Sequence, residues 1–322
     1  MVAAALAAYA LLLAVALPRV LAGSALADRC PRLALCMWQA ATVALMLTVA
    51  LLAVALAVPL TAISGDVADL LQACVMAVRE QYATPGGATA GMMGILLAAT
   101  IAARCAWVLI NSARATRRSR TAHRQALILV GRRGGEPGVT VIDNGAVAAY
   151  CVPGRRRQVV LTTAALECLD EDQLRAVLSH ERAHLRARHH LAVGFATAMA
   201  KAFPMVPLLS TAAAQTAVIV EMLADDAAGR SVQRDSVATA LVSLADATAP
   251  RATLAAGGPS ALRRALRMVS PARPLGSPRL AVGIASTLLM LIAPLVAVSA
   301  PAVAARNTNL CPLPSMTSAV SV

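Results

Sequence analysis

The sequence contains few aromatic residues, a single lysine and no two cysteines spaced as C-x-x-C. Aromatic side chains make up 2% of the 322 residues, so the chain lacks the row of stacking platforms that binds single-stranded nucleic acids. The lack of a C-x-x-C pair argues against a zinc site built from cysteines. The formal net charge is +13, but no aromatic residues are interleaved with the arginines, and we therefore expect no direct binding of nucleic acid.

Apolar residues are abundant. They make up 58% of the chain, and the mean hydropathy is +0.68. A helix needs about 20 apolar residues to cross a bilayer. Four stretches meet or approach this length, at about residues 2–18, 35–62, 88–110 and 280–304. The first begins without a basic residue, which favours a retained anchor over a cleaved signal. The sequence therefore predicts four transmembrane helices, three of them within residues 1–110.

The distribution of basic residues predicts how the chain is oriented in a bacterial plasma membrane. Of the 29 lysines and arginines, 23 lie in residues 111–279. Because cytoplasmic segments carry an excess of basic residues, we expect residues 111–279 in the cytoplasm. Both termini, the connection at residues 63–87 and the tail at residues 305–322 should lie outside. Anionic lipid heads are then the expected partner of the arginines that follow the third span.

Residues 111–279 change from apolar runs to the pattern of a small α+β domain. Short β-branched runs predict strands at residues 139–142, 148–152 and 159–162, with turn signals between them. An edge of this sheet could receive an extended peptide as a further strand. The alternative is a sheet that serves packing alone.

The segment HERAH, which begins at His180, is the most specific motif in a chain with only five histidines. It lies in a helical pattern that Asp170 should cap at its start. Residues four apart share one face of a helix, so His180 and His184 can direct both imidazoles at one metal ion. Glu181 lies beside them and is the candidate general base of a zinc (Zn²⁺) hydrolase.

A catalytic zinc site of this kind needs a third protein ligand. Glu221, in the segment EMLADD, is the preferred candidate, and Asp225 one helical turn later is suited to orient a ligating histidine. His190 is the alternative ligand, since it has the spacing of HExxHxxGxxH proteases. Ala187 replaces the glycine of that motif, so we expect no helix break there, and His189 and His190 become basic groups near the end of the helix.

The apolar segment at residues 191–220 is long enough to be mistaken for a further span. A crossing would place Glu221 on the opposite side of the membrane from His184, and the two could not share a metal ion. Pro204 and Pro207 interrupt the segment, and prolines favour the end of one helix and the start of another. The sequence therefore predicts a helical hairpin that returns Glu221 to the histidines.

The segments HERAH and EMLADDAA resemble the BlaR/MecR-type family of membrane zinc metallopeptidases. The resemblance implies a multi-pass α-helical membrane protein with a cytoplasmic α+β zinc metallopeptidase domain of the gluzincin kind. It also implies zinc ligands at His180, His184 and Glu221, a general base at Glu181 and a supporting carboxylate at Asp225. Those relatives act in signal transduction, by proteolysis that ends in the inactivation of a cytoplasmic transcriptional repressor. A winged-helix repressor is accordingly the expected substrate.

This chain departs from the antibiotic sensors of that family, because it shows no extracellular penicillin-binding domain and no S-x-x-K nucleophile there. Direct sensing of β-lactams is therefore not expected. Two other interpretations stay open. One is an HtpX-like protease for membrane protein quality control, which shares HExxH and ExxxD but separates them further. The other is a noncatalytic membrane scaffold.

Cysteine placement adds one hypothesis about the exterior. Of the seven cysteines, Cys74 and Cys311 are the two predicted to lie outside, where an oxidising environment would allow them to form a disulfide. The other five map to the cytoplasm or its membrane edge and are expected to be reduced thiols.

Overall fold

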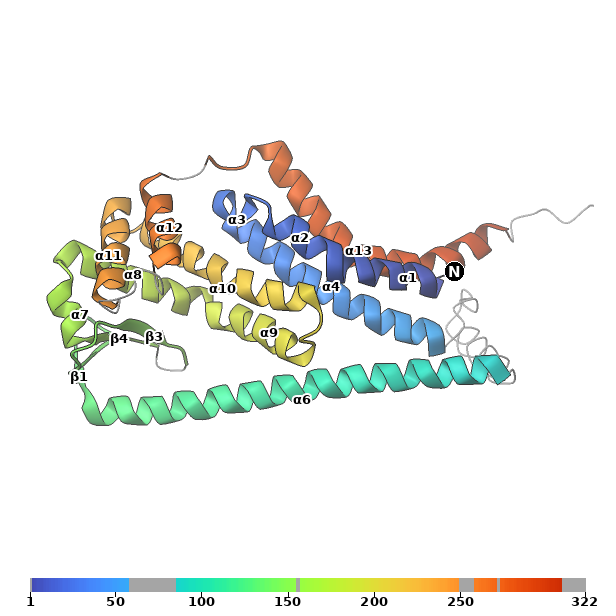
Figure 1. The fold of residues 1–322 in the computed structure, drawn as a ribbon, viewed down its shortest axis with the longest axis horizontal. Coiled ribbons are helices and arrows are strands. Elements are labelled where there is room, and N and C mark those ends of the chain that lie inside the picture. Colours follow the sequence, from blue (N-terminus) through green and yellow to red (C-terminus); the bar gives the residue numbers. More distant parts are fainter. Residues whose placement is uncertain (1, 58–84, 155–156, 249–257, 271–272, 309–322) are drawn as a thin grey trace, which may run out of the picture. The chain divides into compact units, whose positions relative to one another are not determined.

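The structure is a computed structural model, and it describes residues 2–57, 85–154, 157–248, 258–270 and 273–308 (Figure 1). The chain forms two compact units. The first, here called the helical unit, comprises Met1–Leu12, Val43–Ala102 and Leu288–Val322. The second, here called the mixed unit, comprises Leu13–Thr42 and Ala103–Thr287. The predicted pair Cys74 and Cys311 lies outside the described residues, as do most of residues 63–87 and 305–322.

Among the described residues, five helical stretches are long and apolar enough to cross a membrane, which indicates a membrane protein. They are Val2–Ala22, Pro31–Ala57, Gly86–Val130, Pro207–Ala228 and Ser277–Ser299. Four of them overlap the four spans predicted from the sequence. The fifth, Pro207–Ala228, falls in the segment predicted to form a returning hairpin.

In its described residues, the helical unit is built from parts of four helices that pack through small residues. Gly94 lies so close to a neighbouring helix that a Cβ atom there would be 2.7 Å from the carbonyl oxygen of Ala53, so only glycine fits. The hydroxyl group of Tyr9 donates a hydrogen bond to the carbonyl oxygen of Met290 at 2.9 Å. The helices are α1 (Val2–Leu11), α4 (Pro31–Ala57), α6 (Pro85–Val130) and α13 (Ser277–Thr308).

The mixed unit contains a four-stranded sheet in the order β1-β2-β4-β3, formed by β1 (Gly131–Arg133), β2 (Val139–Ile142), β3 (Ala149–Val152) and β4 (Gln158–Thr162). Strands β2 and β4 are parallel, and the two outer pairings are antiparallel. The three predicted strands are confirmed within one residue. Strand β1 was not predicted, because the sequence GRR carries no apolar or β-branched pattern.

Helices cover both faces of the sheet, as the alternation along β4 shows. Val159 and Leu161 are buried in a cluster with residues of helix α8 (Glu171–Ala187), including Val177. Val160 is buried between them on the other face, in a cluster with Leu127 of α6. The central strand is thus apolar on both sides, which fixes its register against both layers.

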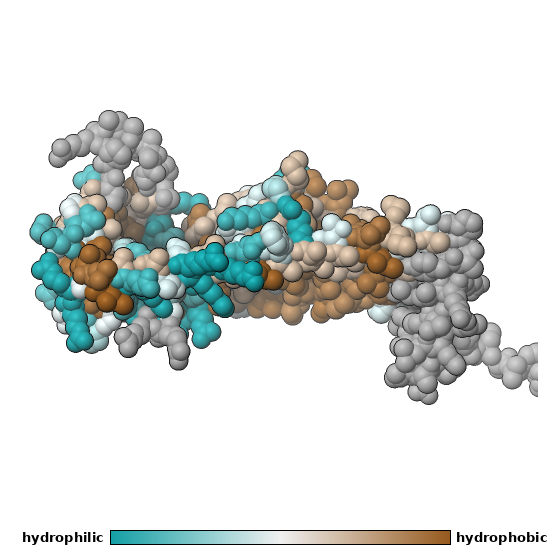
Figure 2. Space-filling view, turned by 90° about the horizontal axis from the view of Figure 1, so that it is seen from below, coloured by the Kyte–Doolittle hydropathy of each residue, from teal (hydrophilic) through white to brown (hydrophobic). Residues whose placement is uncertain are grey.

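Helix α6 continues 20 residues past Ile110, where the third predicted span ends, and reaches Val130. The arginines that follow the apolar run end the membrane span predicted from the sequence, but the helix continues through them, because arginine is a good helix former. Figure 2 shows the change along the exposed face of α6, from hydrophobic side chains toward its N-terminal part to hydrophilic ones toward its C-terminal part. Helix α6 therefore connects an apolar segment that could span a membrane to strand β1 of the sheet.

The remaining elements of the mixed unit are helical. Near the start of the chain they are the π-helical turn η1 (Leu12–Ala16), α2 (Leu17–Ala22) and α3 (Leu26–Arg29). After the sheet they are α7 (Thr163–Cys168), α8, α9 (His189–Ala202), α10 (Pro207–Ala228), α11 (Arg234–Thr248) and α12 (Gly258–Val269). Helix α8 packs against β3, α10 and α11 (Figure 1).

The predicted hairpin is confirmed. Helix α9 ends at Ala202, α10 begins with Pro207 at its first position, and the two helices pack against each other. The expectation of an unbroken helix at Ala187 is wrong. Helix α8 ends there, because Arg188 adopts a left-handed conformation with φ of 52°, and α9 starts at the next residue. Arginine is rarely found in this region, so sequence alone does not signal the break.

Candidate metal centre

A capping box sets the start of α8. The Asp170 carboxylate accepts a hydrogen bond from the backbone N–H of Gln173 at 2.8 Å, and the Gln173 side chain accepts one from the N–H of Asp170 at 3.1 Å. This confirms the predicted cap. Val177, Leu178 and Leu185 then anchor the helix in the core, which leaves the histidine face directed at α10.

Three donor atoms from α8 and α10 converge. The Nε2 atoms of His180 and His184 are 3.1 Å apart, and each lies 3.4 Å from a carboxylate oxygen of Glu221. All three groups lie within 4.8 Å of one another, so they could hold a metal ion. The structure thus brings together the three residues predicted as ligands, and it does so through the hairpin that returns α10 to α8.

The donor set fits zinc. Two imidazole nitrogens and one carboxylate oxygen are a known ligand set of catalytic zinc sites, which keep a fourth position open. Donor atoms about 2.0–2.1 Å from a tetrahedral zinc ion lie roughly 3.3 Å apart. The 3.1 Å between the two Nε2 atoms is close to this spacing, and so are the two distances of 3.4 Å, which join His180 to Oε2 and His184 to Oε1 of Glu221.

Asp225 holds the imidazole of His180 in the orientation that a metal ligand needs. Its Oδ1 lies 2.9 Å from the Nδ1 of His180, which places a proton on Nδ1 and leaves Nε2 free to face the metal position. Asp225 is fully buried, and Arg264 of α12 donates to both of its oxygens at 2.7 Å. Arg264 also reaches Glu221 at 3.2 Å, so a single guanidinium fixes both carboxylates.

His189 adds a contact that the sequence did not predict. Its Nδ1 lies 3.0 Å from the Nδ1 of His184, and its side chain is buried. If His184 presents Nε2 to a metal, its Nδ1–H donates to His189. The break at Arg188 makes this contact possible. His190, the alternative ligand, is absent from the histidine–carboxylate cluster and lines cavities on another side of α9.

The pKa values of the two histidines move in opposite directions. Burial acts to lower the pKa of His180, but its hydrogen bonds to Asp225 and Glu221 outweigh burial and raise the pKa to about 9. Burial lowers the pKa of His184 to about 4. Without a metal, Asp225 and Glu221 therefore favour a proton on His180, whereas His184 stays neutral, as a ligating imidazole must be.

Glu181 faces a cavity of about 160 Å³ that it shares with His180 and Glu221. Burial raises the pKa of Glu181, as suits a group that must accept and return a proton. Its neighbour on β3 is Cys151, whose thiol pKa is raised to about 12 by burial and then by the Glu181 carboxylate. Asp225 and Arg264 also line it, and the rest of the wall is apolar, formed by Ala149, Ala176, Val177, Val237, Ala240, Leu241 and Leu244.

Three residues of this centre were missed from the sequence: Arg264, His189 and Cys151. Arg264 lies 39 residues after Asp225 in an arginine-rich helix that looks like a solvated surface. An amphipathic pattern is a possible signal for it, since Ala265 and Met268 are buried in the core and fix how α12 docks. No local signal marks the other two.

An HExxH helix joined to a carboxylate on a neighbouring helix defines the class of the site as that of a metal-dependent hydrolase. Comparison with family models agrees with this class: residues 112–224 match Peptidase family M48. The match includes both histidines, Glu181 and Glu221, and it supports a zinc metallopeptidase family without confirming the BlaR/MecR type. Neither the curated proteins nor the solved structures contain a match.

Proposed function

We propose that the chain is a zinc-dependent membrane endopeptidase whose active site faces the cytoplasm. The observation that carries this proposal is the convergence of His180, His184 and Glu221 beside Glu181. The match to a peptidase family gives the reaction class, and the candidate spans support a membrane location.

The chain's own residues have separate tasks in this reaction. When bound, zinc would activate a water molecule and polarise the substrate carbonyl. The Glu181 carboxylate takes a proton from the attacking water and delivers it to the nitrogen of the leaving amine, so that it ends the cycle unprotonated. Asp225 and Arg264 hold His180 and Glu221 in place throughout.

The substrate-binding proposal rests on strand β3. It is an edge strand of the sheet, it packs against α8, and its Ala149 lines the cavity beside Glu181. A peptide in extended conformation can add to such an edge by backbone hydrogen bonds, which are independent of sequence. The apolar cavity of about 160 Å³ would then receive one hydrophobic side chain of the substrate.

The cytoplasmic orientation follows from the positive-inside rule, with 23 of 29 basic residues in residues 111–279. In this arrangement α10 belongs to the catalytic domain rather than to the membrane. Its residues Asp225 and Asp226 pair with arginines of α12, and its Glu221 meets the histidines of α8, so both ends of the shared site must lie on one side.

A soluble cytoplasmic regulator, such as a winged-helix repressor, is the substrate that we propose for the cell. The supporting observation is that the active-site elements and most of the charged residues fall in the segment assigned to the cytoplasm. Quality control of membrane proteins is the second candidate.

The direct test of the enzyme compares Glu181→Gln with Glu171→Gln. Both remove one carboxylate from α8, but Glu171 is exposed in the first turn, away from the cavity. Glu181→Gln should keep zinc and lower peptide hydrolysis by about 10²- to 10⁴-fold, the usual contribution of a general base. Glu171→Gln should match the wild type, and His180→Ala should lose zinc. Equal hydrolysis by wild type and Glu181→Gln would exclude this mechanism.

The cellular role can be tested with the same pair of proteins. Cells that express the wild type or Glu181→Gln are compared by mass spectrometry of new protein termini. Cleavage of a transcriptional repressor only in wild-type cells supports the signalling role. Cleavage confined to misfolded membrane proteins supports the quality-control alternative and excludes the regulator as substrate.

A further inference from the structure

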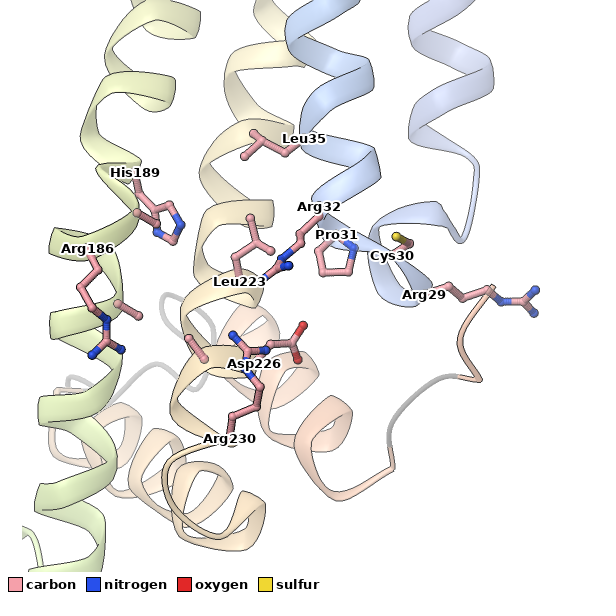
Figure 3. Close-up of a pocket in the computed structure, with 13 residues that line it drawn as sticks. Arg29, Cys30, Pro31, Arg32, Leu35, Arg186, His189, Leu223, Asp226 and Arg230 are labelled. Atoms are coloured by element: carbon pink, nitrogen blue, oxygen red, sulfur yellow. The ribbon is translucent and has the colours of Figure 1, made fainter. Parts of the chain in front are cut away.

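A second and larger cavity, of about 520 Å³, flanks α8 on the face next to the metal site (Figure 3). Helix α8 contributes Ala183, Arg186 and Ala187, and His189 lines the wall at the start of α9. The other walls come from the end of α10 and from the start of α4 with the residues just before it. They are formed by Arg29, Cys30, Pro31, Arg32, Leu35, Leu223, Asp226, Ala227 and Arg230.

The cavity carries an uncompensated positive charge. Four arginines line it, and Asp226 is the single acid among the described lining residues. Both oxygens of Asp226 already accept hydrogen bonds from Arg267 at 2.8 Å. Across the described parts of the chain, no carboxylate lies within ion-pair distance of Arg32, Arg186 or Arg230. Guanidinium groups gathered without acids are suited to bind a phosphate, which accepts their paired N–H groups.

The start of α4 adds a second source of positive potential. Helix α4 is 27 residues long and begins at Pro31, which lines the cavity together with Arg32. Pro31 has no N–H and the N–H of Ala34 donates to the carbonyl oxygen of Cys30 at 3.1 Å, so the N–H groups of Arg32 and Leu33 are the ones without an acceptor within the helix, at the positive end of its dipole. Figure 3 shows the side chains of Arg32 and Arg230 reaching into the space between α8 and the start of α4, whereas Arg29 extends away from it.

The cavity also has an apolar side, which indicates where its ligand comes from. Leu35, one turn after Pro31 in α4, and Leu223, one turn before Ala227 in α10, both line it. From Pro31 onward, α4 is a candidate membrane span. A phosphate-binding pocket at the end of a span faces lipid headgroups at high local concentration, and basic pockets at this depth bind anionic phospholipids. A soluble anion would gain nothing from the leucines.

We propose that this cavity binds the phosphate-bearing headgroup of an anionic phospholipid, with Arg32, Arg186 and Arg230 as its guanidinium donors and an acyl chain lying along the Leu35 side. The site is separate from the peptidase chemistry, but it touches it at one point. His189 lines the cavity and also contacts His184. A lipid bound in the cavity would therefore be separated from the candidate ligand His184 by one side chain, that of His189.

The test measures lipid binding to the full-length, detergent-purified protein by native mass spectrometry. The probes are phosphatidylglycerol, phosphatidylcholine with the same acyl chains, and glycerol 3-phosphate. The test variant is Arg32→Gln/Arg230→Gln. The matched control is Arg132→Gln/Arg133→Gln, which removes the same charge from two exposed arginines of strand β1 outside the cavity. Zinc content and the melting temperature of each variant establish that it is folded.

The expected result is retention of phosphatidylglycerol by the wild type and the β1 control, with affinity at least about tenfold lower in the cavity variant, since each charge-assisted hydrogen bond lost is a strong one. Phosphatidylcholine should bind no better to the wild type than to the cavity variant. An equal loss in both variants would reduce the effect to general surface charge and overturn the proposal. Glycerol 3-phosphate binding as tightly as the lipid would assign the site to a soluble phosphate and overturn the lipid assignment.

Discussion

Two neighbouring faces of helix α8 differ in whether the charged side chains around them have ion-pair partners. On the metal face, Asp225 and Glu221 are each held by Arg264 and by at least one histidine, so both carboxylates have charged partners. On the cavity face, Arg32, Arg186 and Arg230 line the same cavity as one aspartate, Asp226, which is already paired with Arg267. Ala183 lies on the cavity face and the next residue, His184, lies on the metal face, so the two faces are adjacent around the helix axis.

The difference follows from burial. A buried charge without a partner is strongly destabilising, so the buried charges of the metal face must be paired with one another. The arginines of the cavity are exposed, and water can solvate them in the free protein. The fold therefore tolerates a cluster of unpaired arginines at the surface, and we interpret this cluster as a binding site for an anion.

Arg264→Ala should break the metal face. It leaves the fully buried Asp225 without its guanidinium partner, which should lower the free energy of unfolding by about 3–5 kcal/mol. The control is its neighbour Arg263→Ala, whose ion pair with Asp28 lies at the surface and should cost at most about 1 kcal/mol. Denaturant unfolding in detergent measures both. Equal losses would show that Asp225 is compensated by other groups.

Asp225→Asn should weaken metal binding. The amide cannot supply the negative charge that orients and polarises His180, so zinc affinity should fall by about 10- to 100-fold. Asp226→Asn, one residue along, is the matched control, because Asp226 pairs with Arg267 and touches none of the three ligand candidates. Competition with a zinc chelator gives both affinities. An unchanged affinity in Asp225→Asn would remove this residue from the metal centre.

Arg186→Gln should have the smallest effect. The side chain is exposed and, within the described residues, unpaired, so the free energy of unfolding without lipid should stay within about 0.5 kcal/mol of the wild type. A slight gain is expected, since one repulsive charge is removed from the cavity. Thermal unfolding with and without anionic lipid provides the measurement, and a large loss in lipid-free detergent would give the arginine a structural role instead.

Local signals in the sequence predicted the elements of the metal centre well. The spacing of His180 and His184 predicts one helix face, Asp170 predicts the start of that helix, and Pro207 predicts the start of α10. Each of these signals acts within one or two helical turns, where geometry depends on a few neighbouring residues. The hairpin required one further argument, namely that Glu221 and His184 cannot share a metal from opposite sides of a membrane.

The rest of the site depends on contacts between distant segments. Arg264 reaches Asp225 only because α12 docks through Ala265 and Met268, and nothing near Arg264 in the sequence specifies that docking. Cys151 faces Glu181 because of the register between β3 and β4, which the strand prediction left open. The cavity arginines were attributed to the positive-inside rule, which explains their number but not their convergence.

The left-handed residue between α8 and α9 has a consequence for changes in chain length. In a continuous helix, His189 would sit about 140° around the axis from His184, but the turn at Arg188 brings their rings into contact. The same turn sets the direction of the α9–α10 hairpin, which delivers Glu221. One residue inserted or deleted at this junction would rotate the outgoing helix by about 100° and carry Glu221 away from the histidines. The one-residue linker between Ala187 and His189 therefore sets the spacing on which the metal site depends, and insertions elsewhere on the surface should be accepted far more readily than here.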